Sequence, residues 1–350
     1  MEERVLEKEK LRSLLEKFIN EAEVVGVCQR KGKYVYERLK SPDEFCPDFD
    51  VTVQSPKRYI FPPREDLLRF ALGEKIAAEA LFDDKFRVIW GVHPYDIKAI
   101  NIVDLMFEST NKDKHYLQRR QNTFIVGIDP LRASEKSFWH IMEADKVDKG
   151  FDLMLTDIGE EYVITVGTER AKSLLDRFGV SERAGETKIE KREKVRENLK
   201  NLCPQERKLN FSLQALPYLL MRANEAPLWK EKAEKCFSCG SCNLVCPTCY
   251  CFDVQDWMNE DLTEGKRYRL WDGCLLQEFA IVATGENFRK ERYQRYRHRF
   301  YRKGLYIKKE YGIFACVGCG RCAISCLPEI ADPVEVYNEV FNYVKGAVIL

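Results

Sequence analysis

The sequence contains no long hydrophobic run. Its longest apolar stretches, such as residues 279–283, are far shorter than the roughly 20 residues of a membrane-spanning helix. Residues 1–10 are mostly charged and lack the apolar core of a secretory signal peptide. The 57 Lys and Arg residues nearly balance the 56 Asp and Glu residues, so the net charge of +1 gives no overall attraction to nucleic acids or membranes. We therefore expect a cytoplasmic protein without membrane contact.

Nucleotide-binding motifs are also missing. The chain has neither a GxGxxG motif nor a P-loop, so it shows no site of its own for a flavin or a nicotinamide. Histidine is scarce, and the four present are isolated in the sequence, which favours ordinary surface or core positions over bases or ligands: His93, His115, His140 and His298. We accordingly predict no catalytic residue.

Cysteine, in contrast, is abundant and clustered. Eleven of the 14 cysteines lie between Cys236 and Cys326. A disulfide scaffold would be expected in a short secreted chain, whereas clustered thiols in a long cytosolic chain indicate metal ligands.

Two cysteine runs share one spacing. The first is the full C-x2-C-x2-C-x3-C-P pattern and consists of Cys236, Cys239, Cys242 and Cys246, followed by Pro247. The second consists of Cys316, Cys319, Cys322 and Cys326, with Pro328 one place late. This spacing is typical of [4Fe–4S] ferredoxins, whereas structural zinc uses two C-x2-C pairs separated by a longer loop. The sequence therefore predicts two [4Fe–4S] clusters.

The fourth cysteine of each run is expected to bind the cluster of the other run, as in two-cluster ferredoxins. The first cluster would then use Cys236, Cys239, Cys242 and Cys326. The second would use Cys316, Cys319, Cys322 and Cys246. The alternative is that the long insertion between the runs lets each run close on its own cluster.

The insertion carries three further cysteines, Cys249, Cys251 and Cys274. They could hold a third cluster, adjust the properties of the first two, or reduce sulfur themselves. Three thiols are one short of a four-cysteine site, so the sequence favours buried, inert cysteines.

A basic segment follows at residues 289–309, with ten Lys or Arg residues, one Glu and interleaved aromatic residues. Such a pattern can indicate nucleic-acid binding. Cationic side chains beside an anionic cluster, or facing an acidic partner, explain it without a new ligand. We favour the second interpretation and keep nucleic-acid binding as the alternative.

The first half of the chain has an α/β pattern. Strands are predicted at 34–38, 86–90, 123–128, 151–156 and 161–166, and helices at 6–20, 96–107, 168–178 and 188–202. Residues 54–70 contain three prolines, so extended chain followed by a helix is expected there. We predict an α+β protein. An α/β docking domain spans 1–207, and a mostly helical ferredoxin-like domain spans 208–350, with an insertion at about 250–312.

Several motifs together resemble a known family. In the first half of the chain the motifs are Ser55–Lys57, Phe61–Glu65, Gly91–Asp96 and Gly150–Leu153. In the second half they are Cys246–Cys251, Trp271–Cys274, the arginine-rich stretch after Phe288 and the second cysteine run. The chain resembles a family of iron–sulfur subunits that occur in anaerobic sulfite reductase and, as the beta subunit, in cytoplasmic hydrogenase (sulfur reductase).

The resemblance implies a non-catalytic subunit of a cytoplasmic oxidoreductase complex. Such a subunit relays electrons between a flavoprotein that binds a nicotinamide nucleotide and a catalytic reductase or hydrogenase subunit. Many relatives carry a cysteine at the position of Tyr95 and a Cys-x-Cys pair near 137–139, so any cluster bound there is expected to be missing here. Four charged residues at family positions are interpreted as structural ion pairs: Asp96, Asp104, Arg119 and Arg120.

Overall fold

A seven-stranded mixed sheet organises the first half of the chain in the computed structural model, which describes residues 1–72, 76–109 and 111–348. The strand order is β1-β9-β8-β7-β6-β2-β3. The bounds are Glu2–Glu7 (β1), Glu23–Arg30 (β2), Lys33–Arg38 (β3), Arg87–Val92 (β6), Thr123–Ile128 (β7), Leu153–Asp157 (β8) and Glu161–Val166 (β9). Strands β2, β6, β7 and β8 are parallel, and the strands at both edges are antiparallel.

Continuous apolar sequence places the central strands in the core. Every residue of β6 and β7 is buried, as expected for parallel strands covered on both faces. The helices of this half are Leu11–Glu21 (α1), Pro94–Glu108 (α2), Lys114–Gln121 (α3), Glu169–Arg177 (α4) and Glu186–Asn198 (α5). The strands predicted at 123–128 and 161–166 agree with β7 and β9, whereas β1 and β2 were not predicted.

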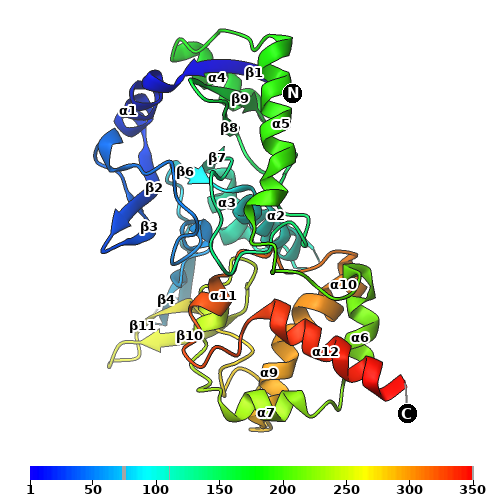
Figure 1. The fold of residues 1–350 in the computed structure, drawn as a ribbon. Coiled ribbons are helices and arrows are strands. Elements are labelled where there is room, and N and C mark those ends of the chain that lie inside the picture. Colours follow the sequence, from blue (N-terminus) through cyan, green and yellow to red (C-terminus); the bar gives the residue numbers. More distant parts are fainter. Residues whose placement is uncertain (73–75, 110, 349–350) are drawn as a thin grey trace.

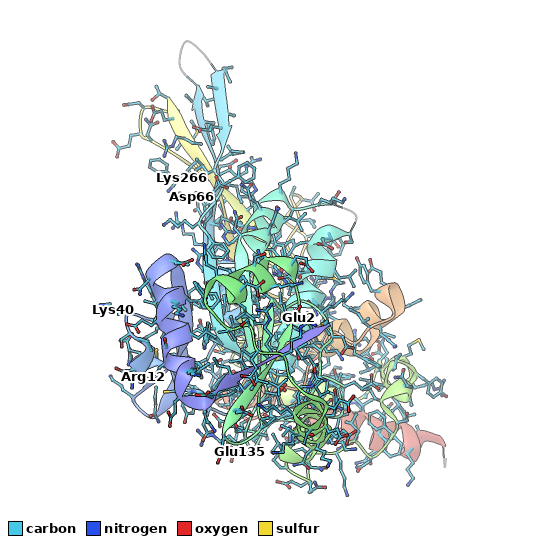
Figure 2. All side chains as sticks on the ribbon, turned by 90° about the horizontal axis from the view of Figure 1, so that it is seen from above. Glu2, Arg12, Lys40, Asp66, Glu135 and Lys266 are labelled. Carbon is cyan, nitrogen blue, oxygen red and sulfur yellow. The ribbon has the colours of Figure 1, made fainter. Side chains whose placement is uncertain are left out.

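A second sheet joins segments that are far apart in the sequence. Its order is β10-β11-β4-β5, with bounds Phe252–Met258, Glu264–Trp271, Arg64–Leu72 and Ile76–Ala80. The helix expected in the later part of 54–70 is wrong, because residues from Arg64 onward pair with β11 of the insertion. Seen from above, this sheet projects from the body of the molecule, with the Asp66–Lys266 ion pair of 2.9 Å near its base (Figure 2).

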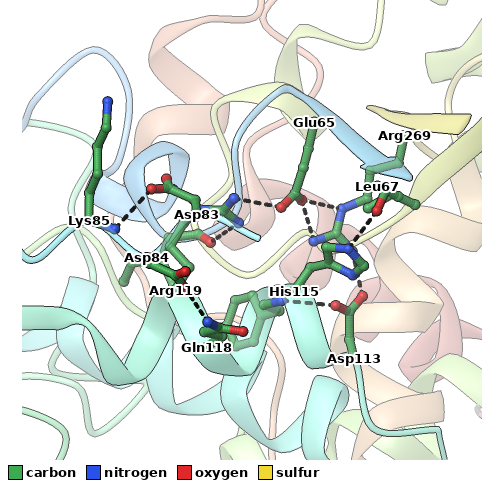
Figure 3. A network of polar contacts seen from close by, with 12 residues as sticks. Glu65, Leu67, Asp83, Asp84, Lys85, Asp113, His115, Gln118, Arg119 and Arg269 are labelled. Carbon is green, nitrogen blue, oxygen red and sulfur yellow. Dashed lines mark hydrogen bonds and ion pairs between the residues drawn. The ribbon is translucent and has the colours of Figure 1, made fainter. Parts of the chain in front are cut away.

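A buried ion network anchors this sheet to the first half (Figure 3). Glu65 on β4 accepts from Arg119 of α3 at 2.6 Å and from Arg269 of β11 at 2.7 Å. Arg269 also pairs with Asp113, and Arg119 with Asp83 at 3.2 Å. The insertion is therefore held by charges that three separate segments supply.

Short helices dominate the rest of the chain, in the lower part of Figure 1. They are Leu216–Arg222 (α6), Leu228–Glu234 (α7), Ser241–Leu244 (α8), Arg292–Tyr301 (α9), Ile307–Tyr311 (α10), Arg321–Ile324 (α11) and Pro333–Val348 (α12). They pack around Trp229, Phe300 and Tyr337. The expectation of a mostly helical second half is incomplete, because its insertion supplies β10 and β11. Among the described helices, none is both long and apolar enough to cross a bilayer.

Candidate metal centres

The first cysteine cavity combines both runs. It is lined by Cys236, Cys239 and Cys242 of the first run and by Cys326 of the second, with about 470 Å³ of space including its mouth. Gly240 has a φ of +74° immediately before α8, so the loop turns sharply between its second and third cysteines. Cys239 is exposed, so this cavity reaches the molecular surface.

The second cavity is the reciprocal one. Cys316, Cys319 and Cys322 line it together with Cys246 of the first run, and its space is about 420 Å³. Of the three cysteines from the second run, Cys319 and Cys322 are buried and Cys316 is half-buried. Each cavity therefore gathers three cysteines of one run and the fourth of the other, the grouping that the ferredoxin pattern led us to expect.

The donor sets fit iron–sulfur clusters. Each cavity presents four thiols and a backbone that bends around them, and the amide of Ser238 donates to the Cys236 sulfur at 3.4 Å. Burial raises the pKa of the Cys242 and Cys316 thiols to about 12. Thiolates are the form that binds metal, so a positively charged iron core would replace the protons held by these buried sulfurs.

The second cysteine loop packs directly on the first half of the chain. The Phe138 amide donates to the Gly318 carbonyl at 2.8 Å. Gly318 has a φ of +68°, and a Cβ there would lie 2.6 Å from the Phe138 carbonyl. At Gly320 a Cβ would lie 2.7 Å from the Lys136 carbonyl. Only glycine at these two positions therefore lets the backbone of residues 136–138 lie against the cysteine loop.

A buried ion pair secures the same loop. Arg321, which lies between the second and third cysteines of the run, donates to Asp96 of α2 at 2.6 and 2.7 Å and to the Thr52 carbonyl at 2.8 Å. Asp96 and Arg321 are both almost completely buried. The structure confirms the interpretation of Asp96 as a structural ion-pair residue and likewise pairs Arg120 with Asp104 at 3.1 Å.

Two aromatic residues lie beside this loop, at positions where the family resemblance implies cysteines in many relatives. Tyr95 stacks on Trp139 with ring centroids 5.0 Å apart, and both belong to an apolar cluster that includes Cys319. Aromatic rings thus fill two of the positions at which the resemblance implies cysteines in many relatives, and Ser137 is buried.

The basic segment turns three cations inward. Arg295, Arg299 and Lys303 recur every fourth residue through α9 and the following π-turn at 302–306, and all three are buried. Arg299 donates to the Cys242 carbonyl at 3.3 Å, and Lys303 to the Thr248 hydroxyl at 2.7 Å. Burial by itself would lower the pKa of Arg299, but the surrounding thiols, Cys242 foremost, hold it well above its usual value.

Lys57 is a further buried cation that the sequence did not single out as functional. Its ammonium donates to the carbonyls of Cys246 at 3.2 Å and Cys249 at 2.7 Å, and it lies 4.0 Å from the Trp271 ring centroid. Burial lowers its pKa to about 8, against the opposing effect of the Cys249 thiol. The sequence could have indicated a role for Lys57, because Lys57 and Trp271 both lie in motifs of the family resemblance.

Comparisons with known proteins agree with this geometry. Residues 235–330 match the family described as a 4Fe–4S dicluster domain. Sulfhydrogenase 2 subunit beta from Pyrococcus furiosus is 33% identical over 319 residues, which cover 91% of this chain and 92% of that protein. The chain belongs to the sulfhydrogenase beta-subunit family. Neither match points to the sulfite reductase side of the resemblance. No solved structure matches the chain significantly.

Proposed function

We propose that this protein is an electron-transfer subunit with two cross-ligated [4Fe–4S] clusters in a cytoplasmic hydrogenase or sulfur reductase complex. Its partners would be a flavoprotein that oxidises a nicotinamide nucleotide and a catalytic subunit. The observation that carries the proposal is the pair of cavities, each ringed by three cysteines of one run and the fourth of the other. The name of the sulfhydrogenase relative supports the kind of complex.

The chain's own residues hold the clusters and adjust their electrostatics. When bound, such clusters accept and release single electrons. Arg299 and Lys303 place buried positive charge beside Cys242 and Cys246, and no ion pair joins either cation to a carboxylate in the described parts of the chain. Buried cations without a carboxylate partner favour an anionic occupant nearby, and they favour its reduced form, which carries one more negative charge.

The same cations bear on the nucleic-acid alternative. A phosphate-binding surface needs exposed Lys and Arg side chains, whereas three of the basic residues in the 289–309 segment point inward. This arrangement supports the cluster-related interpretation of the segment.

The test uses the complex purified without oxygen from its native host. We expect a flavoprotein and a catalytic subunit to copurify, and addition of a nicotinamide nucleotide to bleach the visible absorbance of the clusters. The isolated protein without the flavoprotein should not be bleached. A native complex that contains no flavoprotein, or whose clusters stay oxidised, would refute the relay.

A further inference from the structure

Three cysteines outside the two runs come together at a third cavity. Cys249, Cys251 and Cys274 all line it, with about 960 Å³ of space including its mouth. Cys249 and Cys251 lie between the first run and β10, whereas Cys274 follows β11. The antiparallel β10–β11 hairpin brings the chain back beside Cys251, where the Asp272 amide donates to the Cys251 carbonyl at 3.1 Å. The insertion therefore builds a convergence that sequence spacing did not reveal.

One buried amide connects two of these sulfurs. Asn243 of α8 is 3% exposed, and its Nδ2 lies 3.6 Å from the Cys249 sulfur and 3.3 Å from the Cys274 sulfur. Its Oδ1 is buried and has no hydrogen-bond partner within the described residues. The amide nitrogen is a hydrogen-bond donor, so it stabilises the thiolate form of these two cysteines, the form that binds metal.

Positive charge surrounds the same cavity. Arg299, Arg302 and Lys303 line it, and Lys57 donates to the Cys249 carbonyl. Arg302 reaches the Tyr250 hydroxyl, and no carboxylate is paired with any of these four cations in the parts of the chain that the structure covers. Three thiolates would supply compensating negative charge, which inert protonated cysteines would not.

We propose that Cys249, Cys251 and Cys274 bind a third iron–sulfur cluster of the [4Fe–4S] type, whose fourth iron has no cysteine ligand. Asp272 and His298 also line the cavity and could supply a ligand to this iron. The proposal rests on the electron-transfer function, which it extends. Thr248, Arg299 and Lys303 line both the second and the third cavity, so the new cluster would be next to the second one.

The size of the cavity favours a cluster over a single zinc ion. Zinc draws its ligands to within about 2.3 Å of one atom, so it needs no cavity. With the open mouth of each cavity included, the space lined by the three cysteines is about 960 Å³, against about 470 and 420 Å³ for the first and second cavities. The third cavity can therefore hold a group as large as those proposed for the other two.

The experiment measures metal and sulfide in the full chain after anaerobic reconstitution with ferrous iron and sulfide. We expect about twelve Fe per wild-type chain and about eight in Cys251→Ser and Cys274→Ser. Cys46→Ser is the matched control, because Cys46 is half-buried and lies outside all three cavities. This control should keep about twelve Fe.

A second measurement examines the open iron. Mild oxidation should release it and produce a [3Fe–4S] EPR signal in the wild type and in Cys46→Ser, but not in Cys251→Ser. About eight Fe in the wild type and in all variants would overturn the inference and leave the two-cluster function standing. One zinc per chain, lost in Cys251→Ser, would also overturn it. Loss of iron in Cys319→Ser tests the two-cluster function separately.

Discussion

The first and second cysteine cavities share one ligand spacing but have opposite surroundings. At the first cavity Cys239 is exposed, and the nearby side chains of Phe237 and Leu327 are 68% and 86% exposed. At the second cavity the loop lies under residues 136–139 and is tied to α2 by Arg321. If the protein relays electrons as proposed, the exposed first cavity, with these apolar side chains beside it, is the expected contact with a redox partner.

Equivalent positions in the two loops show how the difference arises. Ser241 and Arg321 both lie between the second and third cysteines, and Ser238 and Gly318 both lie before the second cysteine. Ser238 and Gly318 have positive φ values of 53° and 68°, so the backbones are alike. The second loop meets the backbone of residues 136–139, and it carries the long charged side chain that reaches a buried carboxylate.

The largest expected effect comes from removing shared ligands. If the runs exchange their fourth cysteines, Cys246→Ser should remove or distort the same cluster as Cys319→Ser, because Cys246 lines the second cavity. Each variant should lose about four Fe, and EPR should show the same cluster signal missing. Cys239→Ser should affect the other signal. A match between Cys246→Ser and Cys239→Ser would mean that each run closes on its own cluster.

The next effect compares Arg321 with Ser241. Asp96→Ala should destabilise the holoprotein by about 3–5 kcal/mol, because it leaves the Arg321 guanidinium buried without its partner. Ser241→Ala should cost less than about 1.5 kcal/mol, since it removes one hydrogen bond to the exposed Cys239. Anaerobic urea unfolding of both variants measures the two values. Equal losses would show that the buried ion pair does not distinguish the loops.

Spacing and periodicity were sufficient for some of these features. The cysteine spacing predicted which cysteines would lie together in the first two cavities, and apolar runs located β7 and β9. The four-stranded sheet could not be predicted, since β4 follows prolines and its partner β11 lies about 200 residues away. The sequence shows that the three extra cysteines are one short of a four-cysteine site, but it does not show the cavity, the cations or the Asn243 amide around them.

A smaller effect is expected from the backbone contact alone. Gly318→Ala should destabilise the protein by about 2–3 kcal/mol, because its Cβ would meet the Phe138 carbonyl at 2.6 Å. Ser238→Ala, at the equivalent place in the first loop, should change stability by less than about 1 kcal/mol. Thermal midpoints of the two anaerobic holoproteins provide the comparison. Tolerance of Gly318→Ala would imply that residues 136–139 can move away from the loop.

The smallest change in stability should accompany a functional effect at the exposed cavity. Phe237→Ser and Leu327→Ser alter side chains that are 68% and 86% exposed, so each should shift the unfolding free energy by less than about 0.5 kcal/mol. Both should nevertheless slow cluster reduction in the native complex severalfold, because a docked partner would lose apolar contact beside the first cavity.

Leu262→Ser is the matched control, since Leu262 is 64% exposed but belongs to the turn between β10 and β11. Stopped-flow reduction by the copurified flavoprotein, with iron content checked, separates docking from cluster loss. If Leu262→Ser slows reduction while Phe237→Ser and Leu327→Ser do not, the partner docks on the four-stranded sheet, and the exposure of the first cavity has another cause.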